Sequence, residues 1–289
     1  MNHPPSIPQS NPLSGFMRQP KIYIKLPSGG QYWPKGSIDM PETKELAVYS
    51  MTAKDEMMLK IPDALISGQA LVDVIQHCIP NIKNAWAIPS LDLDVILIAI
   101  RVATYGETMT VPITINEEEM DYGVDLRYVM GELLEQISWQ ESVQVSPELV
   151  VYVKPIDYKQ MSASAVKTFE TQRVLQIVND SSMSNEEKSK SFKEAVDKLN
   201  DITVGLINNS VFRVDSSNGA TDDPRYIKEF LDNADKEIYD KIKTHVEQLR
   251  EKNNIKPVII QPTPEMIEKG AANAPIEIPL LFDPSTFFA

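Results

Sequence analysis

One stretch of the chain, residues 91–104 (LDLDVILIAIRVAT), limits the fold more than any other. Ser90 and Asp92 are typical of a helix N-terminus, and Gly106 supplies the left-handed residue that a helix exit often needs. The predicted helix is apolar on nearly all sides, so it must be covered all round. It is too short to cross a membrane, which takes about 20 apolar residues. The sequence therefore predicts a buried central helix as the spine of a first domain.

The segments on either side of this helix predict a mixed α/β unit. Alternating apolar residues indicate strands and capping residues mark helix starts. The expected strands cover residues 21–26, 45–51, 109–115, 142–146 and 149–154, and the expected helices begin at Thr52 or cover 69–79, 124–138 and 158–178. The fold class that follows is α+β.

The second half of the chain is predicted to be mainly helical. Ser184 and Glu187 form a capping box ahead of one helix, and Asp223–Pro224 begins a helix that continues to about residue 252. Further on, 258–261 and 275–280 are predicted to pair as a hairpin. We therefore divide the chain into a flexible arm, an α/β core domain, a helical region, and a proline-rich hairpin with an aromatic tail: 1–20, 21–180, 184–256 and 257–289.

Arg101 is the one charged residue in the middle of the apolar helix. A buried guanidinium needs a carboxylate or several carbonyl groups as partners. We predict a structural ion pair, with the partner drawn from Asp55, Glu56 and Asp94.

Composition narrows the classes of function. The net charge of −13 opposes binding to nucleic acid and to anionic membranes. Cys78 is the single cysteine, which suits a reducing compartment and does not allow a cysteine-built zinc site within one chain. The N-terminus has no signal-peptide pattern.

No catalytic or cofactor-binding constellation is recognisable. The sequence contains no phosphate-binding loop, no His-Glu-x-x-His motif and no nucleophile elbow. His77 and Cys78 are adjacent, so on a helix they point in different directions and do not form a dyad. The acidic run 117–121 is interpreted as a solvated turn and not as a calcium loop. We expect a non-enzymatic protein with no metal and no cofactor.

Three regions are candidates for contact with another protein, and each has a simpler alternative. The arm 1–20 is either a disordered tail or a strap that orders on a partner. The amphipathic helices within 185–250 either pack on the first domain or bind another chain. The aromatic pair Phe287 and Phe288 docks either within its own chain or on a partner.

Three motifs in a fixed order carry a family resemblance. They are KLPSGGQYWP at 25–34, with the turn residues Pro27, Ser28, Gly30, Trp33 and Pro34, then MTAKDE at 51–56, and SLDLDVILIAIRVATYG at 90–106. Together they resemble the baseplate hub assembly proteins of T-even-like contractile-tailed bacteriophages. The Phe-Phe pair near the C-terminus resembles that family as well. The Cys-x-x-Cys pairs of many relatives are missing here, which puts any metal role in doubt.

The resemblance implies a non-enzymatic role while the baseplate hub is built, as an assembly chaperone or as a minor hub component. The implied partners are other baseplate hub proteins or a second copy of this chain. The implied location is the host cytoplasm during assembly, or the tail baseplate of the virion. The alternatives are a tail-maturation hydrolase, a structural virion subunit with no chaperone role, and a helical adaptor unrelated to phage.

Overall fold

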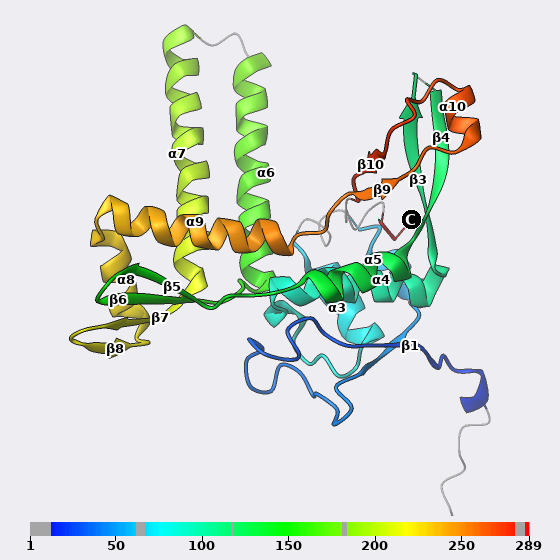
Figure 1. Cartoon of the computed structure of the whole chain (residues 1–289), viewed down its shortest axis with the longest axis horizontal. Coiled ribbons are helices and arrows are strands. Elements are labelled where there is room, and N and C mark those ends of the chain that lie inside the picture. The colour runs from blue at the N-terminus through cyan, green and yellow to red at the C-terminus, as the bar shows by residue number, and fades with distance from the viewer. Residues whose placement is uncertain (1–12, 62–66, 117, 181–183, 281–286, 289) are drawn as a thin grey trace, which may run out of the picture.

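The computed structural model describes residues 13–61, 67–116, 118–180, 184–280 and 287–288. The fold class is α+β, as the sequence predicts. Three hydrophobic clusters organise the chain, and a pair of long helices extends beyond them (Figure 1).

The largest cluster surrounds helix α4 (Ser90–Tyr105), which confirms the predicted central helix. The residues from Leu91 to Ala103 are buried, with the exception of Asp94. The hairpin β1 (Pro20–Ile24) and β2 (Leu46–Tyr49) packs against α4 together with several helices: α1 (Ala53–Met58), α3 (Gln69–Cys78), the short η2 (Ala85–Ala87) and α5 (Leu126–Gln136). Because α4 is apolar on all sides, several elements are needed to cover it, and β1, β2, α3 and α5 lie directly against it.

A second, smaller cluster lies at the end of a long hairpin. Strands β3 (Thr108–Ile115) and β4 (Glu118–Asp125) pair antiparallel, so the residues from Glu118 to Asp121 belong to a strand and the predicted solvated turn is wrong there. Ile113 and Ile115 pack against residues from β9 (Val258–Ile260), α10 (Pro264–Glu268) and β10 (Ile276–Ile278). Strands β9 and β10 pair antiparallel, which confirms the hairpin predicted between 258–261 and 275–280.

The third cluster is built on a four-stranded antiparallel sheet of order β5-β6-β7-β8. Its strands are β5 (Ser142–Ser146), β6 (Leu149–Val153), β7 (Val211–Ser216) and β8 (Gly219–Thr221), and helices α8 (Pro224–Asn233) and α9 (Lys236–Asn253) pack against it. The single helix predicted from residue 224 to 252 is therefore two helices, separated at Ala234–Asp235. The clusters also do not follow the predicted boundary at residue 180, because β6 pairs with β7, which lies beyond it.

Helices α6 (Tyr158–Asp180) and α7 (Asn185–Ser210) form an antiparallel pair that stands away from the rest of the molecule (Figure 1). Their 23 and 26 residues correspond to about 35–39 Å at 1.5 Å per residue. Only the foot of the pair enters the clusters: Tyr158 and Met161 contact the first, and Ile207 contacts the third. We call this pair the α6–α7 hairpin. Among the described residues, no helix is long and apolar enough to pass through a membrane.

Candidate interaction surfaces

The predicted turn motif is organised by a carboxylate from α4. Asp92 is fully buried and accepts three hydrogen bonds: the Ser28 backbone N–H donates at 2.8 Å, the Ser28 hydroxyl at 2.5 Å, and Trp33 Nε1 at 2.7 Å. The Gly30 N–H in turn donates to the Ser28 hydroxyl oxygen at 3.1 Å. These bonds attach the loop between β1 and β2 to the first turn of α4. The sequence marks Asp92 only as a helix-start residue, and nothing local indicates donors from 64 residues away.

Burial dominates the electrostatics at Asp92. It raises the pKa of this carboxyl group, although the bonds from Ser28 and Trp33 oppose that effect. Asp94 is half-buried, and burial raises its pKa to about 6. Two acidic residues only two positions apart on α4 therefore have different environments. Asp92 has three donors, while no hydrogen bond from a described residue satisfies Asp94.

The predicted ion pair of Arg101 with Asp55, Glu56 or Asp94 is wrong. Arg101 is 8% exposed, and its Nη1 donates to the backbone carbonyl of Phe287. Its guanidinium carbon lies 5.3 Å from the ring centroid of Tyr105 and 5.4 Å from that of Phe287. A carbonyl and two aromatic faces take the place of a carboxylate. Within the described part of the chain, Nε of Arg101 has no hydrogen-bond partner.

The other predicted partners of Arg101 have different roles. Asp55 accepts from the backbone and hydroxyl of Thr52 and lies 2.7 Å from His77 Nδ1, so it joins α1 to the end of α3. Burial would raise the pKa of Asp55, but these hydrogen bonds outweigh it and the pKa falls below its ordinary value. Glu56 lies beside the Tyr105 hydroxyl and, after burial, is the main cause of the raised pKa of Tyr105.

The aromatic tail docks within its own chain. Phe287 and Phe288 are 1% and 6% exposed and belong to the cluster around α4. The Tyr105 hydroxyl donates to the Phe288 carbonyl at 2.9 Å, one helical turn from the bond that Arg101 makes with Phe287. In this conformation the pair is not available to a partner, so the alternative of a partner contact at Phe287 and Phe288 is wrong here.

The acidic, histidine and cysteine side chains of the described residues do not gather into a metal site. No group of three or more His, Cys, Asp or Glu side chains in that part of the chain is placed to hold a metal ion. Cys78 is buried, and burial raises the pKa of its thiol to about 12, so the thiolate is disfavoured beside the Asp55–His77 pair.

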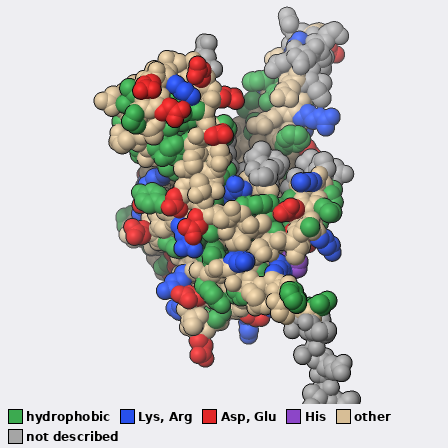
Figure 2. Space-filling model, turned by 90° about the vertical axis from the view of Figure 1, so that its right-hand side faces the viewer, with side chains coloured by type: hydrophobic (Ala, Val, Ile, Leu, Met, Phe, Trp, Pro, Cys, Tyr) green, Lys and Arg blue, Asp and Glu red, His purple; other side chains and the backbone are tan. Residues whose placement is uncertain are grey.

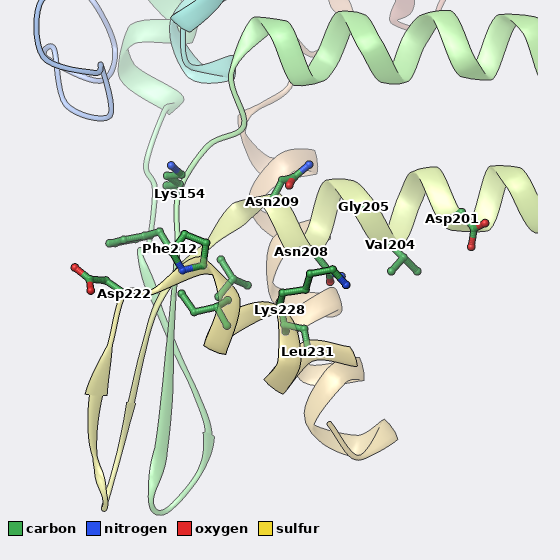
Figure 3. A pocket seen from close by; sticks show the side chains of 13 residues that line it. Lys154, Asp201, Val204, Gly205, Asn208, Asn209, Phe212, Asp222, Lys228 and Leu231 are labelled. Carbon is green, nitrogen blue, oxygen red and sulfur yellow. The ribbon is translucent and has the colours of Figure 1, made fainter. Parts of the chain in front are cut away.

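A cavity of about 800 Å³ lies between the foot of α7, strand β7 and helix α8 (Figure 3). Its inner side is apolar, with Phe212, Ile227 and Leu231. Its rim carries charges of both signs, with Lys154, Lys228, Asp201 and Asp222. A mixed lining of this kind does not single out a ligand class.

An exposed apolar segment precedes β1. The short turn η1 (Ser14–Phe16) and the residue after it place Phe16 at 88% and Met17 at 54% exposure. Figure 2 shows apolar side chains where the N-terminal trace leaves the body. Arg18 anchors the base of this segment: Nη1 donates to the Ser50 carbonyl at 2.7 Å and Nη2 to the His77 carbonyl at 2.6 Å. We call residues 13–17 the arm segment. In the sequence, the adjacent apolar residues of the Gly-Phe-Met-Arg string mark this segment, but the many prolines around it favour a flexible arm over residues 1–20.

The upper half of the α6–α7 hairpin is a second exposed apolar surface. Three large side chains there are roughly half exposed: Phe169 at 53%, Val174 at 45% and Phe192 at 56%. Thr171 and Ala195 are buried where the two helices meet. By contrast, the apolar stripe expected on residues 224–252 is largely covered, because Ile227, Leu231 and the apolar face of α9 belong to the third cluster.

Comparison with known protein families shows to which family the chain belongs. A family model described as T4 bacteriophage base plate protein matches residues 19–256, which is most of the chain. This chain belongs to that family. It is a phage baseplate protein, and membership supports a structural or assembly role in the baseplate in contact with other baseplate proteins. No curated protein and no solved structure matches this baseplate protein. The matched range covers all three sequence motifs and the α6–α7 hairpin.

Proposed function

We propose that this baseplate protein acts in building the baseplate hub, as an assembly factor or minor hub component that works by protein contact and without catalysis. Its place is then the host cytoplasm during assembly, with the tail baseplate of the virion as the destination if it is a component. The observation that carries the proposal is the arm segment. Phe16 is almost fully exposed although the chain beside it is anchored through two backbone carbonyls.

The physical argument rests on the cost of that exposure. Leaving a phenylalanine in water forfeits about 1.5–3 kcal/mol of burial energy. Met17 beside it is also exposed, and a flexible thioether adapts to irregular apolar surfaces. The Arg18 anchor limits the loss of entropy when the segment binds, because its base is already held. The family match supports another baseplate protein as the partner.

The test is affinity purification of the tagged full chain from phage-infected cells, with the recovered proteins identified by mass spectrometry. Intact protein should recover named hub proteins, and the Phe16→Ser/Met17→Ser variant should recover several-fold less. Ile259→Ser is the matched control, because Ile259 is 67% exposed on β9, far along the chain from the arm. Equal recovery by all three proteins would remove the arm segment from the proposal. Failure of the intact protein to recover any hub protein would refute the assembly role.

Mass spectrometry of purified virions separates the two forms of the proposal. A stoichiometric copy number would identify a hub component, and absence from virions combined with hub proteins in the purification would identify an assembly chaperone.

A further inference from the structure

The N-terminal part of the chain differs from the rest in its charge. Residues 1–38 contain four basic residues and no acidic residue, whereas residues 39–289 contain 24 basic and 41 acidic residues. The net charge of −13 therefore divides into +4 on the N-terminal part and −17 on the remainder. The arm segment, for which a protein contact is proposed above, belongs to the positive part.

The fold adds further positive charge beside the base of the arm segment. Arg18 and helix α1 meet at the same residue: Arg18 Nη2 donates to the His77 carbonyl at 2.6 Å, and the Asp55 carboxylate lies 2.7 Å from His77 Nδ1. The exposed side of α1 and the turn after it carry Lys54 and Lys60. Figure 2 shows blue and purple side chains beside the green ones where the N-terminal trace leaves the body.

These cations are not neutralised by the carboxylates next to them. Within the described ranges, no carboxylate forms an ion pair with Arg18, Lys54 or Lys60. Asp55 is buried and already accepts hydrogen bonds within the chain, and Glu56 lies beside a tyrosine hydroxyl of α4. The base of the arm segment is therefore surrounded by cations that are open to an external anion.

Apolar side chains lie among these cations. Phe16 and Met17 of the arm segment are largely exposed, and on α1 and the turn after it Met57 is 67% and Ile61 is 51% exposed. The apolar side chains gain free energy when they are buried, and the cations gain it when they meet carboxylates. A surface of this composition needs a counterpart that offers an apolar area with anionic groups around it.

We propose that the partner of the arm segment presents an apolar groove bordered by Asp and Glu side chains. The proposal rests on the protein contact of the arm segment argued above, and it adds the chemistry of the partner. Charge complementarity supports it, because carboxylates are attracted to the surroundings of the arm segment and repelled by the net charge of −17 on residues 39–289. An acidic partner is thus directed to one side of the molecule.

Nucleic acid and anionic membranes also attract cations, but they fit this charge distribution less well. Both are extended anionic surfaces, so they would also face the acidic remainder of the chain, which repels them. A groove on a protein confines its carboxylates to the area around the arm segment. The distribution of charge therefore favours a protein partner.

The measurement is zero-length cross-linking with a carbodiimide, which joins an amine to a carboxylate only when the two groups are in contact. The tagged full chain is purified from phage-infected cells, cross-linked and analysed by mass spectrometry. Lys54 or Lys60 should be joined to Asp or Glu residues of another protein. Lys252 and Lys256, which are exposed in and after the last turn of α9, should give no such cross-link.

Charge reversal tests the same contact. Lys54→Glu/Lys60→Glu should recover several-fold less of the cross-linked protein than the intact chain does, and recovery by the intact chain should fall as salt screens the attraction. The matched control, Lys252→Glu/Lys256→Glu, changes the total charge by the same amount and should recover as much as the intact chain. Lys54 lies in the first turn of α1, where a glutamate is favourable, and equal melting temperatures would show that all three proteins are folded.

Two results would refute an acidic partner and leave the arm segment as a hub contact. One is recovery of hub proteins that requires Phe16 and Met17 but responds neither to the lysine variant nor to salt. The other is a complex with hub proteins in which neither Lys54 nor Lys60 is cross-linked to a carboxylate.

Other results separate this proposal from the role in the hub. Cross-links from Lys54 or Lys60 to carboxylates of a protein outside the baseplate would uphold the acidic partner and refute the hub assignment. Flotation with phosphatidylglycerol vesicles that depends on both lysines, without any cross-link to a protein, would identify a lipid surface and refute the proposal. If the full chain recovers no protein at all, both the acidic partner and the hub contact are refuted.

Discussion

Replacing Asp92 by alanine should destabilise the protein, because its carboxyl group joins α4 to the loop between β1 and β2. Three donors would lose their acceptor: the Ser28 N–H, the Ser28 hydroxyl and Trp33 Nε1. The Ser28 N–H is buried, and stranding such a group costs about 1–3 kcal/mol. Trp33 is only half-buried, so its N–H can turn to water at a smaller cost. Relief from burying the Asp92 carboxylate offsets part of the loss. We expect a net decrease of about 3 kcal/mol, which is at the lower end for removing one partner of a buried charged contact.

The assay is urea unfolding at neutral pH, followed by circular dichroism and by tryptophan fluorescence, since Trp33 reports on the loop itself. Asp92→Asn keeps one acceptor oxygen, so its free energy of unfolding should fall by about half as much as that of Asp92→Ala. Asp94→Asn on the same helix turn is the comparison: no described donor is lost there, so this variant should not destabilise the protein. A decrease below about 1 kcal/mol for Asp92→Ala would show that the loop is held by other contacts. Equal effects at positions 92 and 94 would show that burial alone, and not the three hydrogen bonds, decides the outcome.

Three further predictions follow from the same contacts. The pKa of Asp94 is about 6 in the folded protein, against about 4 in the unfolded chain. The stability gained from protonating this carboxyl group is fully present below about pH 4 and is lost as the pH rises through about 6. Asp94→Asn should therefore stabilise the protein by about 3 kcal/mol at pH 7 and by little at pH 4, measured as urea midpoints across pH. Arg101→Ala removes the hydrogen bond to the Phe287 carbonyl and two contacts with aromatic rings, so the free energy of unfolding should fall by about 2–3 kcal/mol in the same assay. A decrease under about 0.5 kcal/mol would mean that the tail docks without Arg101. Deleting residues 1–17 should leave the melting temperature unchanged, because none of the arm segment belongs to a hydrophobic cluster. Arg18→Ala should lower the melting temperature, because two hydrogen bonds to backbone carbonyls are lost. A large decrease from the deletion would contradict the assignment of the arm segment to the surface.

Local signals in the sequence predict local structure well in this chain. The all-round apolar pattern of residues 91–104 correctly predicts a buried helix, because no other placement removes it from water. The capping boxes at Thr52–Asp55 and Ser184–Glu187 are both present, because each depends on residues three positions apart. The break between α8 and α9 was missed because the apolar spacing of three and four continues across Ala234, and periodicity alone does not register a change of axis.

Long-range pairing accounts for the parts that the sequence did not predict. Strand β7 joins β6 after the whole α6–α7 hairpin has intervened, so a boundary placed at the polar linker near residue 180 separates strands that belong to one sheet. The acidic residues Glu118–Asp121 form a strand because β4 is largely exposed, and its pairing with β3 supplies the stability that the side chains do not. Neither pairing leaves a signature in the neighbouring residues.

The partner of Arg101 determines whether the aromatic tail is open to another protein. The sequence presents a buried cation and several nearby carboxylates, so an ion pair is the natural expectation. In the structure, Arg101 and Tyr105 are four residues apart on α4 and bind two consecutive carbonyls, those of Phe287 and Phe288. An arginine placed to hold a backbone segment is thus the reason that the aromatic tail is covered by its own chain. With the tail accounted for, the arm segment is among the regions whose large apolar side chains remain exposed, and Phe16 is the most exposed of them. The hub contact is therefore assigned to the arm segment and not to the docked tail.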